Sequence, residues 1–160
     1  MTLEYLDNGN PEGSIARGQH QPVISGLAGG TTARQLLASE SGSLCLFDNA
    51  AGQIYTLPAP VVGMRFDFLV TVAGTSNAYS IDTDAATTFI GGGVAAVSTT
   101  VAEGGDSFVA DITSHVSCDL DSDVTGRLVG TTLSIVCLSS TTWGISGTIH
   151  GVGTLATPFA

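Results

Sequence analysis

The chain has 160 residues and carries 14 acidic side chains against four basic ones, which gives a formal net charge of -10. A potential of this sign repels nucleic acids and anionic membranes, because contacts with phosphate need clustered Lys and Arg. With 43% hydrophobic residues the chain can bury a full core without metal or disulfide staples, so we expect one folded domain and no nucleic-acid or membrane partner.

The first thirty residues are rich in Gly, Asn, Pro and Gln and show no sustained periodicity. This composition predicts an extended N-terminal arm (residues 1–30) ahead of a single β domain (residues 31–160). The arm is either a frayed terminus or a segment that orders against a partner. In the second case its larger apolar side chains are the contact candidates: Leu3, Tyr5, Leu6 and Ile15.

Two features of the sequence bear on where the protein is made. The opening MTLEYLDNGN lacks the basic start and apolar run of a signal peptide. No apolar stretch approaches the roughly 20 residues needed to span a bilayer. We therefore expect synthesis and folding in a cytoplasm.

Short strands dominate from Arg34 onward. The segment TTARQLLAS fits either a short helix or a strand, and SLCLF and QIYTL flank DNAAG, whose residues suit a tight turn. LPAP ends the second of these strands, because proline has no N–H to donate to a ladder. The clearest strand is MRFDFLVTV, in which five side chains share one face by alternation. They are Met64, Phe66, Phe68, Val70 and Val72.

Six further strand candidates follow, separated by turn clusters such as AGTSN, EGGD, DSDVTG and SSTT. They are AYSI, TTFI ending at GGG, FVADI, SHVSCDL, LSIVCL and WGISGTI. Regular short strands separated by such turn clusters predict an all-β fold, an antiparallel sandwich or barrel of jelly-roll-like type.

The segment SHVSCDLDSD, residues 114–123, gathers the residue types that bind metals and move protons. On a strand, Cys118 lies with the apolar side chains and His115 lies on the opposite face, so a Cys–His nucleophile pair is not expected. The three cysteines, Cys45, Cys118 and Cys137, form no CxxC pair. We interpret them as buried free thiols rather than as a metal site or a nucleophile.

Asp119, Asp121 and Asp123 have the one-three-five spacing that begins a calcium loop. Such a loop needs Gly at its sixth position and an acidic ligand at its twelfth, where this chain has Val124 and Gly130. The segment is better interpreted as an acidic hairpin turn, with weak cation binding at the three aspartates left open.

Motifs of catalysis are missing from the sequence: GxSxG, a Walker loop, HExxH, and a GxGxxG that opens a helix. His20 and His150 lie in Gly-rich surroundings without carboxylates nearby in sequence. A triad of distant residues is left open, but the expectation is a protein that is not an enzyme and has no cofactor, metal or catalytic residue.

Several segments from about Arg34 to the C-terminus, taken in order, carry a family resemblance. Their most distinctive pieces are TLPAP, TSNAY, LVGT, TTW and ATPF. The series resembles the head decoration (cement) proteins of tailed bacteriophages. The resemblance implies a virion protein on the outside of an assembled capsid, commonly a homotrimer at three-fold and quasi-three-fold positions, which clamps neighbouring major capsid protein subunits. It implies no catalytic residue, and the acidic DLDSD turn departs from it.

The alternative function is a carbohydrate-binding β-sandwich, such as a lectin-like or fibre-tip domain. Sugar sites usually present exposed aromatic side chains near Asp or Asn. Here Trp143 alternates with Ile145 and Ile149, which predicts that the tryptophan is buried.

Overall fold

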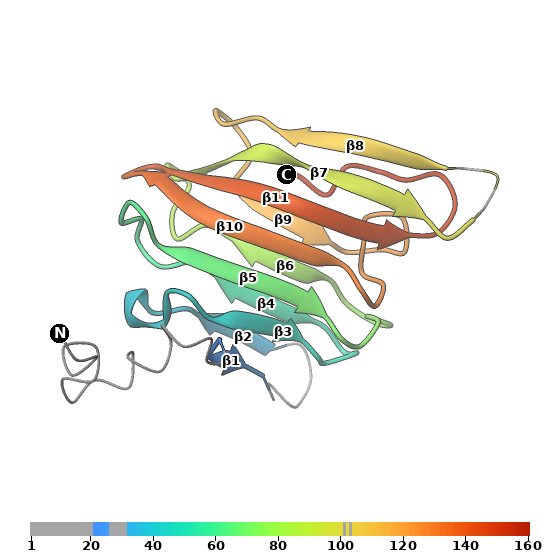
Figure 1. Cartoon of the computed structure of the whole chain (residues 1–160), viewed down its shortest axis with the longest axis horizontal. Coiled ribbons are helices and arrows are strands. Elements are labelled where there is room, and N and C mark those ends of the chain that lie inside the picture. The colour runs from blue at the N-terminus through green and yellow to red at the C-terminus, as the bar shows by residue number, and fades with distance from the viewer. Residues whose placement is uncertain (1–20, 26–31, 101, 103) are drawn as a thin grey trace, which may run out of the picture.

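The computed structural model describes residues 21–25, 32–100, 102 and 104–160. Across these residues, eleven strands form a seven-stranded and a four-stranded sheet that pack face to face (Figure 1). One short 3-10 helix, Ala38–Glu40, accompanies them. The predicted all-β sandwich is confirmed.

The larger sheet is built from strands of both halves of the chain. Its strands, in spatial order, are β1 (Val23–Ile24), β3 (Leu44–Phe47), β5 (Arg65–Val70), β10 (Thr132–Ser139), β11 (Thr142–Gly151), β7 (Phe89–Ser98) and β8 (Gly105–Ala110). The smaller sheet orders β2 (Thr32–Gln35), β4 (Gln53–Thr56), β6 (Tyr79–Asp82) and β9 (Ser117–Leu120).

The chain crosses from one sheet to the other at each step from β1 to β6. Strands β1, β3 and β5 are therefore parallel to one another, and so are β2, β4 and β6. The DNAAG segment is a turn, but it carries the chain from β3 in one sheet to β4 in the other rather than closing a hairpin. A strand in the opposite sheet thus serves as the crossover that a parallel pair requires.

The sheets are consequently mixed, and the expectation of purely antiparallel pairing is corrected. β10 runs antiparallel to β5 and β11, β8 to β7, and β9 to β6, whereas β11 and β7 are parallel over ten residue pairs. Alternation of apolar residues reveals which face of a strand is buried, but the same alternation suits a parallel or an antiparallel neighbour.

Strand β5 follows the predicted register. Met64, Phe66, Phe68 and Val70 are buried, and Val72, which lies beyond the strand, is 38% exposed. In the pairing with β10, Phe68 stands opposite Leu133 on the same face. The inward set predicted from alternation is therefore confirmed within the strand.

Strand β7 differs from its prediction because it continues through the three glycines and ends at Ser98. At Gly92 the backbone has φ of +108°, and a Cβ there would lie 2.3 Å from the Ile145 carbonyl oxygen of β11. A glycine is needed for this close approach, so in this position it extends the strand rather than stopping it.

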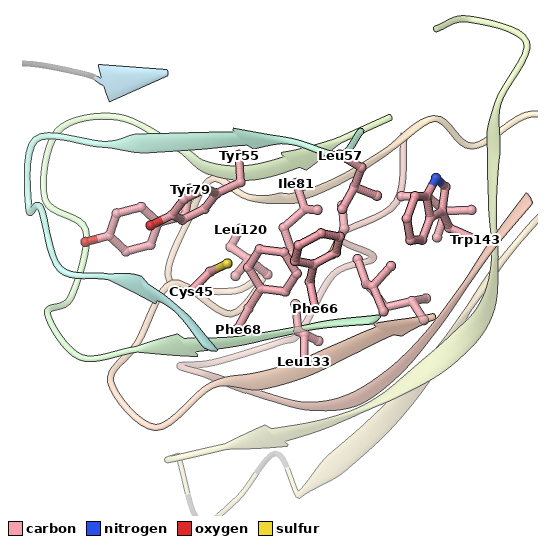
Figure 2. Close-up of a cluster of buried hydrophobic side chains, with 14 of the residues drawn as sticks. Cys45, Tyr55, Leu57, Phe66, Phe68, Tyr79, Ile81, Leu120, Leu133 and Trp143 are labelled. Atoms are coloured by element: carbon pink, nitrogen blue, oxygen red, sulfur yellow. The ribbon is translucent and has the colours of Figure 1, made fainter. Parts of the chain in front are cut away.

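The core fills the space between the two sheets (Figure 2). The ring of Phe47 lies 4.8 Å from that of Tyr79 and 5.3 Å from that of Tyr55, measured between centroids. Trp143 is fully buried and its ring lies 6.3 Å from that of Phe66, which confirms the predicted burial of the tryptophan. Aromatic pairs at such separations add to the stability gained from area burial.

All three cysteines are buried and carry free thiols, as predicted. Burial raises the pKa of the Cys45 thiol to about 12 and also raises that of Cys118. A thiol whose pKa is raised by burial is a poor nucleophile, because the thiolate is the reactive form. These side chains act as small apolar core residues.

The N-terminal stretch makes at least one ordered contact with the larger sheet. Val23–Ile24 forms β1, Ile24 is buried, and the Gln21 side chain donates a hydrogen bond of 2.8 Å to Asp67. Residues 21–25, which lie within the predicted arm, therefore contact β3 and β5. The contact candidates Leu3, Tyr5, Leu6 and Ile15 lie outside the described residues.

The segment TTARQLLAS, predicted as either a short helix or a strand, contains both kinds of element. Its described residues begin with strand β2, Thr32–Gln35, and end in the 3-10 helix. The carboxylate of Glu40 accepts a hydrogen bond from the backbone N–H of Leu37 and forms an ion pair with Arg34. The short helix is thereby tied back to the strand before it.

Candidate functional site: an acidic hollow on the smaller sheet

The outer face of the smaller sheet carries a square of two serines and two aspartates. On β6, Ser80 and Asp82 alternate with the core residue Ile81, and on β9, Ser117 and Asp119 alternate with Cys118. The antiparallel register places Ser80 opposite Asp119 and Asp82 opposite Ser117. Each serine therefore faces an aspartate across the ladder and has another along its own strand.

The hydrogen bonds of this square, which we call the Ser–Asp square, join its two strands. The Ser80 Oγ lies 2.6 Å from Asp119 Oδ1 and is also in contact with Asp82 Oδ1. The Ser117 Oγ donates to Asp119 Oδ2 at 2.9 Å. Asp119 is thus contacted by a serine hydroxyl at each of its carboxyl oxygens.

An open hollow of about 720 Å³ lies over the Ser–Asp square. Ile54 of β4, Asp84 and Asp121 also line it. The Oδ1 atom of Asp84 is buried and has no hydrogen-bond partner among the described residues. The hollow therefore combines four aspartates: Asp82, Asp84, Asp119 and Asp121.

The electrostatics of the hollow favour protons and cations. Burial raises the pKa of Asp82, the hydrogen bond from Ser80 opposes this, and the negative charge of Asp119 adds to the rise. The three arginines that the structure describes are each paired with a carboxylate on their own chain, namely Arg34 with Glu40, Arg65 with Asp67, and Arg127 with Asp123. No described arginine or lysine lines the hollow.

The three aspartates of the predicted acidic turn contact different groups, although Asp119 and Asp121 both line the hollow. Asp119 belongs to the Ser–Asp square, Asp121 accepts a hydrogen bond of 2.8 Å from Thr125, and Asp123 pairs with Arg127 at 2.7 Å. Among the described residues, no group of three or more His, Cys, Asp or Glu side chains is arranged to hold a metal ion. The turn is not a hairpin, because β9 is followed by β10 in the other sheet.

His115 and Cys118 occupy different surroundings. Cys118 is in the core, whereas the His115 ring stacks on Phe159 and its Nδ1 accepts a hydrogen bond of 2.6 Å from the Asp111 N–H. The predicted separation of these two side chains is confirmed, and no Cys–His nucleophile pair forms.

Sequence reasoning missed Ser80, Asp82 and Asp84 as members of a site. A signal for them was available, because Ser-x-Asp occurs at 80–82 and again at 117–119, each time with an apolar residue between. On strands this spacing places both polar side chains on the outer face. What the sequence does not show is that these two strands are neighbours.

The chain matches no protein-family model, no curated protein sequence and no solved structure. Within the described part of the chain, none of the helical segments has the length and apolar character that crossing a bilayer requires.

Proposed function

We propose that the protein is a structural component of a bacteriophage virion, which binds the outside of the capsid as a decoration protein and stabilises it. In this proposal the protein acts as a homotrimer at three-fold positions and its partner is the major capsid protein. The observation that carries the proposal is the acidic hollow, which lies on the outer face of a tightly packed sandwich and has no described basic side chain to neutralise it.

The sandwich is suited to a passive binding role. Its two sheets enclose one continuous cluster of buried apolar side chains, so the surface has little freedom to rearrange. The edge strand β9 is covered by the C-terminal residues, since Asp119 N–H donates to the Pro158 carbonyl at 2.6 Å and Val116 N–H to that of Ala160 at 2.7 Å. Covering an edge in this way prevents unwanted strand pairing.

The charge of the hollow defines the partner chemistry that fits it. Carboxylates that have no cationic partner among the described residues are complementary to Lys or Arg on a partner surface. Each exposed ion pair contributes little by itself, of the order of 0.2 to 1 kcal/mol. Three copies held together multiply such weak contacts, which suits attachment to a repeating lattice.

A carbohydrate-binding role lacks its usual platform here. The described aromatic residues are buried or half-buried, and Trp143 is fully enclosed. Stacking on a sugar ring requires an exposed aromatic face. The burial of the described aromatic rings therefore favours the capsid proposal over this alternative.

The proposal is tested by co-sedimentation of the full chain with capsids assembled without it. The hollow variant is the double substitution Asp84→Asn and Asp121→Asn, and the control is Asp106→Asn, an exposed aspartate on strand β8 of the other sheet. We expect wild type and control to pellet with capsids and the hollow variant to bind several-fold more weakly, with added salt weakening wild-type binding. Failure of the wild type to pellet contradicts the proposal, and equal binding of the hollow variant contradicts the role of the hollow.

A further inference from the structure

The Ser–Asp square contains fewer hydroxyl protons than its contacts require. A serine hydroxyl has one proton to donate, yet the Ser80 Oγ is within hydrogen-bond distance of carboxyl oxygens of both Asp82 and Asp119. With both carboxyls ionised, one of these contacts places two oxygen atoms together without a proton between them. A proton on one carboxyl satisfies both, because that carboxyl then donates to Ser80 while Ser80 donates to the other.

We propose that Asp82 is held in its protonated form and donates to Ser80 Oγ while Ser80 donates to Asp119, and that loss of this proton makes the smaller sheet a pH-sensitive element. In the protonated state a continuous chain of donors runs from Asp82 through Ser80 to Asp119, whose second oxygen is held by Ser117. When the proton leaves, two carboxylates on adjacent strands repel one another and one hydrogen bond is lost.

Burial limits the access of water to the Ser80 hydroxyl, so water does not readily supply the missing hydrogen bond. Ser80 is only 5% exposed, so water has little access to the bridging hydroxyl. The raised pKa of Asp82 has the direction that the geometry requires.

Uncharged side chains flank the pair on one side of the sheet. The neighbouring strand β4 presents the uncharged side chains of Ile54 and Thr56 on the outer face, and β2 beyond it presents Ala33 and Gln35. The charged or titratable groups on the remaining sides are Asp84 after β6, Asp121 after β9 and His115 before β9. The Nδ1 of His115 accepts a hydrogen bond from the Asp111 N–H. The negative charge of Asp119 adds to the rise that burial causes in the pKa of Asp82.

The sign of the pH effect follows from the raised pKa. Asp82 binds its proton more tightly in the folded chain than in the unfolded chain, so the native state holds more protons between the two pKa values. This contribution to stability is complete below the unfolded pKa and is lost as pH rises through the folded pKa. An Asn at position 82 imitates the protonated acid, because its amide donates to Ser80 at any pH.

The test compares thermal unfolding of the full chain and of Asp82→Asn from about pH 4 to about pH 8. We expect the two Tm values to be close at the acidic end and the variant to become the more stable by at least about 2 °C at the basic end. The control Asp106→Asn, exposed on β8, should keep a constant offset from wild type. An offset for Asp82→Asn that does not grow with pH overturns the proposal.

A second measurement needs no variant and decides the matter if Asp82→Asn fails to fold. Carbon-13 NMR of the aspartate carboxyl groups in the wild-type chain should show Asp82 titrating above the usual aspartate range. A titration of Asp82 within or below the usual range would refute the proposal.

Discussion

Replacing Gln53 with Leu should destabilise the fold, although the two side chains are similar in size. Gln53 is fully buried at an inward position of β4. Its Oε1 accepts hydrogen bonds from the backbone N–H groups of Asp48 and Asn49, at 2.9 and 3.3 Å. Its Nε2 donates to the Leu46 carbonyl and to the Tyr55 hydroxyl, each at 3.0 Å. One amide thus fixes the turn that carries the chain from the larger sheet to the smaller one.

The magnitude follows from the groups that lose a partner. Leucine removes the acceptor of two backbone N–H groups, while the Leu46 carbonyl keeps its 2.9 Å hydrogen bond from Tyr55. Each of these two hydrogen bonds contributes about 0.5 to 1.5 kcal/mol, so the free energy of unfolding should fall by about 1 to 3 kcal/mol. For a chain of this size that corresponds to a fall in Tm of roughly 2 to 12 °C.

Thermal unfolding followed by circular dichroism measures the effect of Gln53→Leu directly. The matched control is Gln35→Leu, the same chemical change at an exposed position of β2, for which a Tm change below about 2 °C is expected. If Gln53→Leu unfolds within about 2 °C of wild type, the hydrogen bonds of Gln53 do not hold the turn and the reasoning is refuted.

Three further predictions follow from the core, the N-terminal stretch and the acidic turn. Because all three cysteines are buried and their pKa values are raised, a thiol reagent should label none of them in the native chain and all of them in denaturant; rapid native labelling would contradict the packing. Deleting residues 1–20 should leave the Tm nearly unchanged, and it should weaken capsid attachment if this segment contacts the capsid. Deleting residues 1–30 also removes Ile24, whose burial contributes about 1.5 to 3 kcal/mol to the free energy of unfolding. This longer deletion should therefore lower the Tm by roughly 3 to 12 °C. Equal Tm values for the two truncations would show that β1 adds no stability. Adding EDTA should leave the Tm unchanged, and a fall of more than about 10 °C would reveal a stabilising metal.

The inward-facing residues could be predicted from the sequence because alternation depends only on the strand itself. The aromatic set of β5, the burial of Trp143 and the placement of Cys118 away from His115 were all obtained in this way. Gln53 was not, because a polar side chain at an inward position breaks the alternation, and its four partners are assembled only when β3 and β4 enter different sheets.

Strand neighbours and the acidic hollow could not be predicted, since both depend on pairing between distant segments. Ser80 and Asp119 are 39 residues apart and meet only because β6 pairs with β9. The three aspartates after Cys118 are close in sequence, yet they bind different groups because the chain turns away from the smaller sheet after Leu120. The glycines of β7 suggested an end to the strand, whereas contact with β11 extends it.

Electron-microscopy reconstruction of capsids incubated with the full chain is the decisive test of the proposed function. We predict additional density on the outer surface at three-fold positions, in groups of three copies of the β-sandwich. We also predict that the acidic face of β6 and β9 lies against basic capsid residues. Capsids that carry no additional density after incubation at saturating protein, or that carry single copies away from the three-fold positions, would contradict it.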